Sequence, residues 1–148
     1  MQSRKIFVAK CATVLSVPLL LLAHSDGPEQ RKTGAPGDTT CMQSQCHVGT
    51  AVNASGNLVS LAFSGGTTYV PGEKQRITIT NSDTDARRAY GFQLTARLAS
   101  DESNGQAGRF TAVEPQTFVM CNDGEERDRA PRNGTCRAGQ EVEFIEHS

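Results

Sequence analysis

Apolar and polar side chains alternate through residues 90–100, "YGFQLTARLAS". Four apolar residues stand at every second position: Phe92, Leu94, Ala96 and Leu98. A period of two is that of a half-buried β-strand, whereas a helix would spread the same four side chains around its circumference. The segment therefore predicts a strand, and the rest of the chain must supply a sheet that covers one of its faces.

Other short segments are alternating, or are apolar and bounded by turn residues. They are residues 58–63, 75–82, 109–113, 117–120 and 142–148. The polar stretch 101–108 is expected to be a turn, and residues 121–136 a charged loop between two cysteines. No sustained helical periodicity is found, so the pattern predicts an all-β protein, an antiparallel sandwich.

The core of this sandwich is expected to be aliphatic and modest, because aromatic residues make up only 5% of the chain and Trp is absent. The side chains predicted to be buried are Phe63, Ile77, Ile79, Phe92, Leu94, Leu98, Phe110 and Phe144. Arg97 and the mixed charges of residues 125–132 are interpreted as solvated.

Residues 1–25 have the pattern of a secretory signal peptide. Arg4, Lys5 and Lys10 precede an apolar run, residues 11–23, that is shorter than the ~20 residues needed to span a bilayer. We expect cleavage after Ser25 and a secreted or otherwise extracytoplasmic product, in the periplasm or at the cell surface. The mature chain would have no transmembrane segment, and its 12 basic and 16 acidic residues, net −4, give no nucleic-acid footprint.

Four of the five cysteines follow this leader: Cys41, Cys46, Cys121 and Cys136. An even number of cysteines in an exported chain predicts disulfides, and three pairings are possible. A Cys121–Cys136 bridge would close a polar loop of ~15 residues, worth roughly 3 kcal/mol, and would leave Cys41 and Cys46 together.

The segment "CMQSQCH" suggests a second chemistry, because His47 directly follows Cys46. Two thiols can form thioether links to haem while an adjacent histidine ligates the iron. Haem motifs usually have two residues between the cysteines and this one has four, a spacing that resembles sites in some multihaem cytochromes. Under this hypothesis Cys41, Cys46 and His47 hold a c-type haem, and His147 is the first candidate for the second iron ligand.

Met120 and Met42 are the next candidates for that ligand. Three simpler readings stay open. In the first, the cysteines are paired in disulfides with His47 at the surface; in the second, His147 is a strand-end histidine bonded to backbone; in the third, Cys41 and Cys46 have a spacing permissible for zinc.

No Ser-His-Asp order, pair of catalytic carboxylates or phosphate loop is recognised, so an enzyme is not expected. The expected partner is an extracellular protein or a redox partner, which the sequence does not identify.

Seven short words occur in order along the chain: "TGAP" followed by a cysteine, "YVPGE", "ITIT", "YGFQLTAR", "GRFT", "VMC" and "IEHS". This set resembles the Reeler (reelin-type) domain family, and more narrowly its bacterial secreted members, in which a Cys-His pair follows "TGAP". The likeness covers residues 33–148. It implies an immunoglobulin-like antiparallel sandwich that works outside the cell in adhesion, matrix or surface redox proteins, without a catalytic triad.

The resemblance also implies a disulfide and a domain organisation. In animal Reeler domains the cysteine after the entry segment pairs with that of "VMC", which here would join Cys41 to Cys121. Family members continue past "EHS", so the expected organisation is a leader (1–25), an irregular entry arm carrying the Cys-His cluster (26–56) and a C-terminally truncated sandwich (57–148). The expected function is an exported, non-catalytic recognition or adhesion module, either with one covalent haem for electron transfer or stabilised by disulfides without a cofactor.

Overall fold

The computed structural model describes residues 27–43, 51, 57–83, 90–129 and 134–147. These residues contain strands and no helix. The strands are β1 (Asn57–Phe63), β2 (Ile77–Asp83), β3 (Gln93–Thr95), β4 (Arg97–Leu98), β5 (Asp101–Gln106), β6 (Thr117–Cys121), β7 (Glu126–Asp128) and β8 (Glu143–His147). Every pairing is antiparallel, which confirms the predicted all-β class. The strands form three sheets, and this pairing does not establish the two facing sheets of a sandwich.

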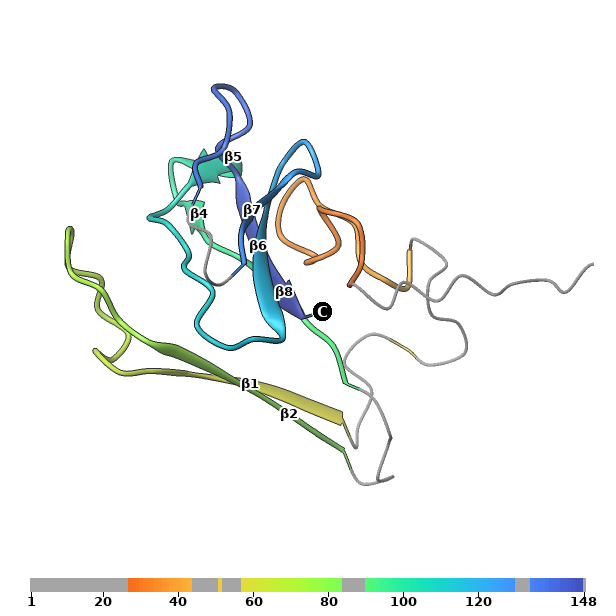
Figure 1. Cartoon of the computed structure of the whole chain (residues 1–148). Coiled ribbons are helices and arrows are strands. Elements are labelled where there is room, and N and C mark those ends of the chain that lie inside the picture. The colour runs from red at the N-terminus through yellow and green to blue at the C-terminus, as the bar shows by residue number, and fades with distance from the viewer. Residues whose placement is uncertain (1–26, 44–50, 52–56, 84–89, 130–133, 148) are drawn as a thin grey trace, which may run out of the picture.

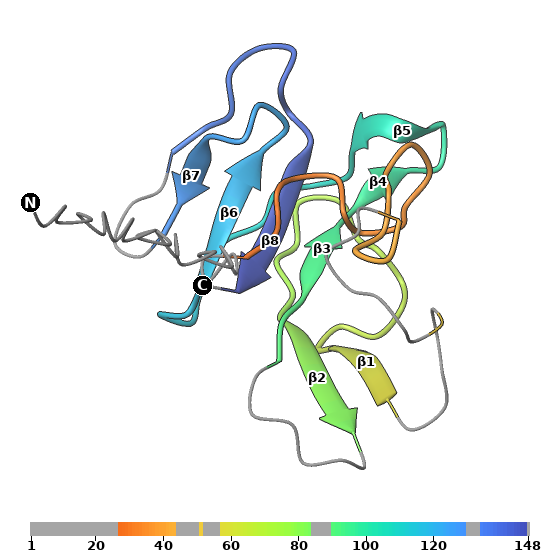
Figure 2. The same cartoon turned by 90° about the vertical axis from the view of Figure 1, so that its right-hand side faces the viewer.

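The central sheet has four strands in the order β3-β8-β6-β7, which lie side by side in Figure 2. Residue Ile145 of β8 stands opposite Leu94 of β3 and Val119 of β6. Strand β8 is paired on both edges, and its residues Glu143, Phe144 and Glu146 are buried. Phe144 and Val119 are fully buried, and the prediction that Phe144 lies in the core is confirmed.

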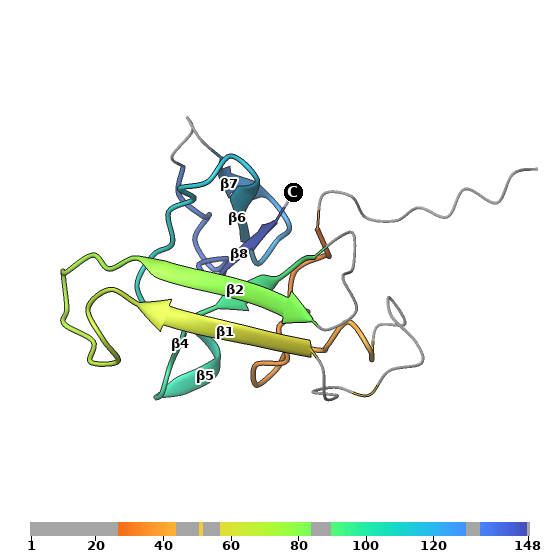
Figure 3. The ribbon, with the colours of Figure 1, turned by 90° about the horizontal axis from the view of Figure 1, so that it is seen from below.

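Strands β1 and β2 form a separate hairpin, paired from Asn57↔Asp83 to Phe63↔Ile77. The hairpin lies below the central sheet in Figure 1 and is seen along its length in Figure 3. The predicted alternation is present, but its apolar face is poorly covered: Phe63 is 37% exposed and Val59 63%. The prediction that Phe63 is buried is therefore wrong, because little of the described chain packs on that face.

The strongest predicted strand, residues 90–100, is extended but interrupted. It contributes β3 to the central sheet and then β4 to a two-stranded sheet with β5, with a register shift between Arg97 and Leu98. The shift turns Leu98 outward, where it is 45% exposed, so its predicted burial is wrong. The polar stretch expected to be a turn is strand β5 instead, since a strand pair that covers no core needs no apolar alternation.

Residues 109–113 were expected to form a strand but do not. Their backbone donors bond to carboxylates rather than to a neighbouring strand: the N–H of Phe110 donates to Glu143 Oε2 at 2.8 Å, and that of Ala112 to Asp128 Oδ2 at 3.1 Å. The sequence pattern could not reveal these partners. The remaining residues predicted to be buried are only partly so: Ile77, Ile79, Phe92, Leu94 and Phe110.

Candidate functional site

The entry arm is fixed to the domain by a buried ion pair. The Asp38 side chain is fully buried and receives Arg97 Nη2 on both carboxylate oxygens, at 3.1 and 3.0 Å. The Arg97 side chain is only 6% exposed, and Nη1 also donates to the Ser103 carbonyl. The interpretation of Arg97 as a solvated charge is thus wrong, because the carboxylate that neutralises it lies 59 residues earlier.

Arg31 makes a second connection between the arm and the domain. Its backbone is left-handed, with φ of 64°, a conformation that costs energy in a residue with a side chain. Its guanidinium contacts Asp38 at 3.2 Å, and its Nε donates to Asn122 Oδ1 at 2.6 Å. Nη1 also donates to the Ser103 carbonyl at 3.3 Å, so Arg31 connects the arm both to β5 and to the residue that follows β6.

The "TGAP" turn is held by the same buried carboxylate, that of Asp38. Thr33 Oγ1 donates to Asp38 Oδ2 at 2.7 Å, and the β-bridge Thr33↔Thr40 closes the loop. A turn over residues 41–43 follows, in which Cys41 and Met42 are half-buried. Of the predicted haem-binding residues, Cys41 is thus placed on an anchored loop, while Cys46 and His47 lie outside the described residues.

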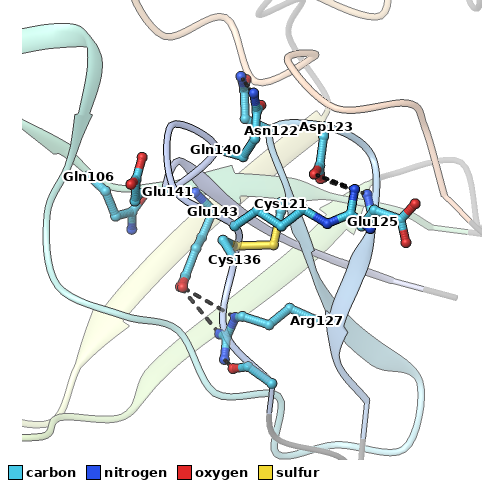
Figure 4. Close-up of a disulfide and its surroundings, with 12 residues drawn as sticks. Gln106, Cys121, Asn122, Asp123, Glu125, Arg127, Cys136, Gln140, Glu141 and Glu143 are labelled. Carbon is cyan, nitrogen blue, oxygen red and sulfur yellow. Dashed lines mark hydrogen bonds and ion pairs between the residues drawn. A yellow bond between two sulfur atoms is a disulfide. The ribbon is translucent and has the colours of Figure 1, made fainter.

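Cys121 and Cys136 form a disulfide with a Cα–Cα distance of 5.6 Å, shown in Figure 4. Cys121 is 3% exposed at the end of β6, so the bridge joins the central sheet to the chain leading into β8. This is the pairing that closes the polar loop 121–136, one of the three that the sequence left open. The pairing of Cys41 with Cys121 that the family resemblance implied is not formed, because Cys121 is bonded to Cys136.

Beside the disulfide, Arg127 and Glu143 form a buried ion pair, also visible in Figure 4. Arg127 Nε lies 3.2 Å from Glu143 Oε1, and Nη1 donates to the Gly134 carbonyl at 2.9 Å. Residues 125–132 are therefore not uniformly solvated as interpreted, since Arg127 and Asp128 are 6% and 2% exposed. The buried carboxylates of Glu143 and Asp128 accept hydrogen bonds from backbone N–H groups of residues 109–113, so their role is structural.

His147, the first candidate for an iron ligand, is held against Phe92. Its Nδ1 lies 3.0 Å from the Phe92 nitrogen and 3.1 Å from the Phe92 oxygen. With the proton on Nε2, Nδ1 accepts the backbone N–H; with the proton on Nδ1, it donates to the carbonyl and leaves the Nε2 lone pair unprotonated. The ring covers Gly91, where an added Cβ would stand 2.6 Å from Nε2.

The two methionine candidates do not share an element with His147. Met120 is half-buried on β6 opposite Phe144, and Met42 lies in the turn of the arm. Within the described ranges no three His, Cys, Asp or Glu side chains are grouped as a metal site.

Glu146 is an acidic residue that the sequence analysis missed. It is fully buried; Oε2 accepts a 2.6 Å hydrogen bond from Gln93 Nε2, while Oε1 is buried without a hydrogen-bond partner. Burial raises the pKa of Glu146 to about 7, and the Gln93 hydrogen bond opposes that shift. Alternation along β8 places Glu146 on the same face as Phe144, which is predicted to be buried, so the pattern held a signal for this burial that the acidic residue type obscured.

The exposed apolar side chains gather on the hairpin and its turn. Val59 and Leu61 are exposed on β1, and Tyr69 and Val70 on the turn that leads to β2, with Tyr69 65% exposed. The turn also encloses a polar depression of about 240 Å³ whose lining includes Glu73.

In the ranges that the structure describes, no helix is long and apolar enough to cross a membrane. No curated protein and no solved structure shows significant similarity to the chain. The family model for the Reeler domain matches residues 39–134. This match runs from the anchored turn of the entry arm to the chain just before Cys136, and the chain thus belongs to the Reeler domain family.

Proposed function

We propose that the chain is an exported, non-catalytic Reeler module that acts outside the cytoplasm by binding another extracellular molecule, with disulfides and no cofactor. The leader-like residues 1–25 would direct export. Exposed apolar side chains such as Tyr69 and Leu61 are of the kind that binding modules present to partners.

One observation carries this proposal: the Cys121–Cys136 disulfide is built into the central sheet. Cys121 is buried on β6, in the part of the strand that pairs with β8, so the bridge is attached to the core of the domain. Structural disulfides persist in extracytoplasmic compartments and are reduced in most cytosols. A domain that depends on this bridge is therefore suited to work outside the cytoplasm.

Cell fractionation of a host that produces the full chain tests the proposal. We expect the protein outside the cytoplasm, with a peptide that links Cys121 to Cys136 in a non-reducing digest. A matched chain without residues 1–25 should remain in the cytoplasm with both thiols reduced. Equal retention of both chains in the cytoplasm would contradict the proposed export.

The second candidate function is electron transfer through a covalent c-type haem on Cys41, Cys46 and His47. The feature that favours it is in the sequence, where His47 directly follows Cys46 and Cys41 stands five residues before Cys46. His147 could offer Nε2 to iron if Nδ1 donates its proton to the Phe92 carbonyl at 3.1 Å. When bound, such a haem would supply one-electron redox chemistry.

Protein from a host that matures c-type haems distinguishes the two functions. The module without cofactor is colourless, and a second disulfide together with Cys121–Cys136 lowers its mass by four hydrogens. The haem protein keeps its colour after acid–acetone extraction, and His47→Ala should disturb its spectrum more than His147→Ala. A colourless product from a host that loads other c-type proteins would reject the haem.

A further inference from the structure

The outer edge of β1 lacks the features that normally keep a strand from pairing with another chain. Among the described residues β1 pairs with β2 alone, over seven residues and without a register shift. Its sequence, "NLVSLAF", contains no charged residue, proline or glycine. Soluble proteins usually protect an outer edge with charges, prolines, bulges or short strands, because its unpaired N–H and C=O groups readily bind a further strand.

The other outer strands of the described sheets have such protection. Strands β5 and β7 contain charged residues, and each pairs through a register shift. Strands β3 and β4 have only three and two residues. In the hairpin, the Asn81 amide of β2 donates to the Gly91 carbonyl at 3.2 Å, so β2 is the strand that contacts the rest of the domain. The long unprotected edge is therefore that of β1.

The hydrogen bonds of the hairpin show which backbone groups this edge offers. The Ser64 N–H donates to the Arg76 carbonyl at 3.0 Å, so these two residues form a hydrogen-bonded pair. Bonded and non-bonded pairs alternate along an antiparallel ladder. Ser60, four residues before Ser64, therefore bonds toward β2, while Val59 and Leu61 direct their N–H and C=O groups outward.

A second copy of β1 is complementary to these groups. Two antiparallel β1 strands centred on Ser60 place Val59 of each copy opposite Leu61 of the other, so every outward group of these residues finds a partner. All seven residues of the strand then overlap. Val59 and Leu61, which are 63% and 43% exposed, become neighbours across the new seam, and no like charges meet because the strand has none.

We propose that the outer edge of β1 is a self-association site, through which two copies of this chain pair into one continuous four-stranded sheet. The contact uses the same surface on both copies, so it closes into a twofold dimer and does not propagate. One pair of seven-residue strands covers less than the roughly 800 Å² per partner of a stable complex, so the dimer is weak and reversible. The inference goes beyond the proposed function and depends neither on export nor on the molecule that the module binds.

Analytical ultracentrifugation tests the proposal on protein purified after expression of the full chain. The dimer fraction should rise between about 10 µM and about 500 µM. Ser60→Lys should abolish the dimer, because it places two like charges directly opposite each other on the twofold axis. Ser60 is exposed in the monomer, where lysine fits without repacking. A wild-type chain that stays monomeric at the higher concentration, or a dimer that Ser60→Lys leaves intact, would overturn the proposal.

Thr80→Lys is the matched control. Thr80 is exposed and stands opposite Ser60 in the hairpin, so the variant adds the same charge to the same face but on β2. In the proposed dimer the two Thr80 positions are three strand spacings apart, about 14 Å, where salt screens their repulsion. Thr80→Lys should therefore leave the dimer intact. Equal losses from the two lysines would show an effect of net charge and not of the β1 edge, and the proposal would fail.

A charge-swap experiment keeps the test decisive if a single variant is monomeric because its hairpin is disturbed. Ser60→Lys and Ser60→Glu chains should each be monomeric alone, and an equimolar mixture should recover the dimer, because opposite charges then face each other across the axis. A mixture that stays monomeric while the wild-type chain dimerises would assign the wild-type dimer to another surface, and the proposal would be wrong.

Discussion

The central sheet and the β1–β2 hairpin differ in burial although both are regular antiparallel structures. The hairpin has the longer paired strands, each of seven residues, yet Val59 is 63% exposed on its apolar face. In the sheet, the five-residue strand β8 contains Phe144, which is fully buried. Strand length and pairing alone therefore do not decide which side chains are buried, because pairing joins strands edge to edge and leaves each face of the sheet to be covered by other parts of the chain.

The difference in burial between the two regions is tested by truncating one apolar side chain in each. Phe144→Ala should destabilise the domain by about 3–5 kcal/mol, because it opens a cavity in the sheet. Leu61→Ala should cost under about 1 kcal/mol, since Leu61 is already 43% exposed. Urea unfolding measures both.

Phe144→Leu provides a milder change if the alanine variant does not fold. Equal costs for the Phe144 and Leu61 truncations would contradict the contrast between the two regions.

The disulfide provides a second test of this comparison, because it joins the end of β6 in the central sheet to the chain that leads into β8. Its two cysteines are 15 residues apart, and the loop-entropy model gives such a bridge about 3 kcal/mol. Cys136→Ser should lower the free energy of unfolding, measured in urea without reducing agent, by about this amount. A domain as stable with Cys136→Ser as without it would show that the bridge is incidental.

The pH dependence of stability isolates Glu146 on β8. Burial raises its pKa from 4.5 to about 7 in the folded chain. Folding then favours the protonated acid, so stability falls as the pH rises from about 4.5 through 7. We expect a loss on the order of 2 kcal/mol across this interval.

Glu146→Gln should flatten that pH profile, because glutamine does not titrate. Urea unfolding at pH 5 and pH 7 makes the comparison. A profile that is unchanged by the substitution would assign the pH dependence to another group.

The smallest expected effect concerns an ion pair between the hairpin and the chain before β6. Arg76 Nη1 lies 4.0 Å from Glu114 Oε1, and both side chains are more than half exposed. Glu114→Gln should change stability by less than about 0.5 kcal/mol in thermal or urea unfolding. A larger loss would show that the hairpin depends on this contact.

Periodicity predicted some of the strands but not all of them. The alternation in residues 90–100 correctly predicted extended chain, and the predicted strands at 58–63, 75–82, 117–120 and 142–148 correspond to β1, β2, β6 and β8. Strand β5 and strand β7, which lies in the predicted loop 121–136, were missed because their polar sequences carry no apolar alternation.

The charged residues were the harder part to predict. Arg97 and Arg127 were taken for solvated side chains, but each is neutralised by a buried carboxylate distant in sequence: Asp38 for Arg97 and Glu143 for Arg127. Such pairs leave no periodic signal, since their partners are set by the tertiary fold. The Cys-His cluster stays a prediction, because Cys46 and His47 lie outside the residues that the structure describes.

Native-state hydrogen exchange tests most directly whether the four-stranded sheet, rather than a two-layer sandwich, holds this domain together. Under native conditions the bonded amides of β6 and β8 should exchange only through global unfolding, while those of β1 and β2 exchange through local opening at rates at least a hundredfold higher. The Cys136→Ser change should accelerate β6 and β8 exchange and leave the hairpin rates nearly unchanged. Equal protection of the hairpin and the central sheet would contradict the account, because it would mean that β1 and β2 form a packed second layer.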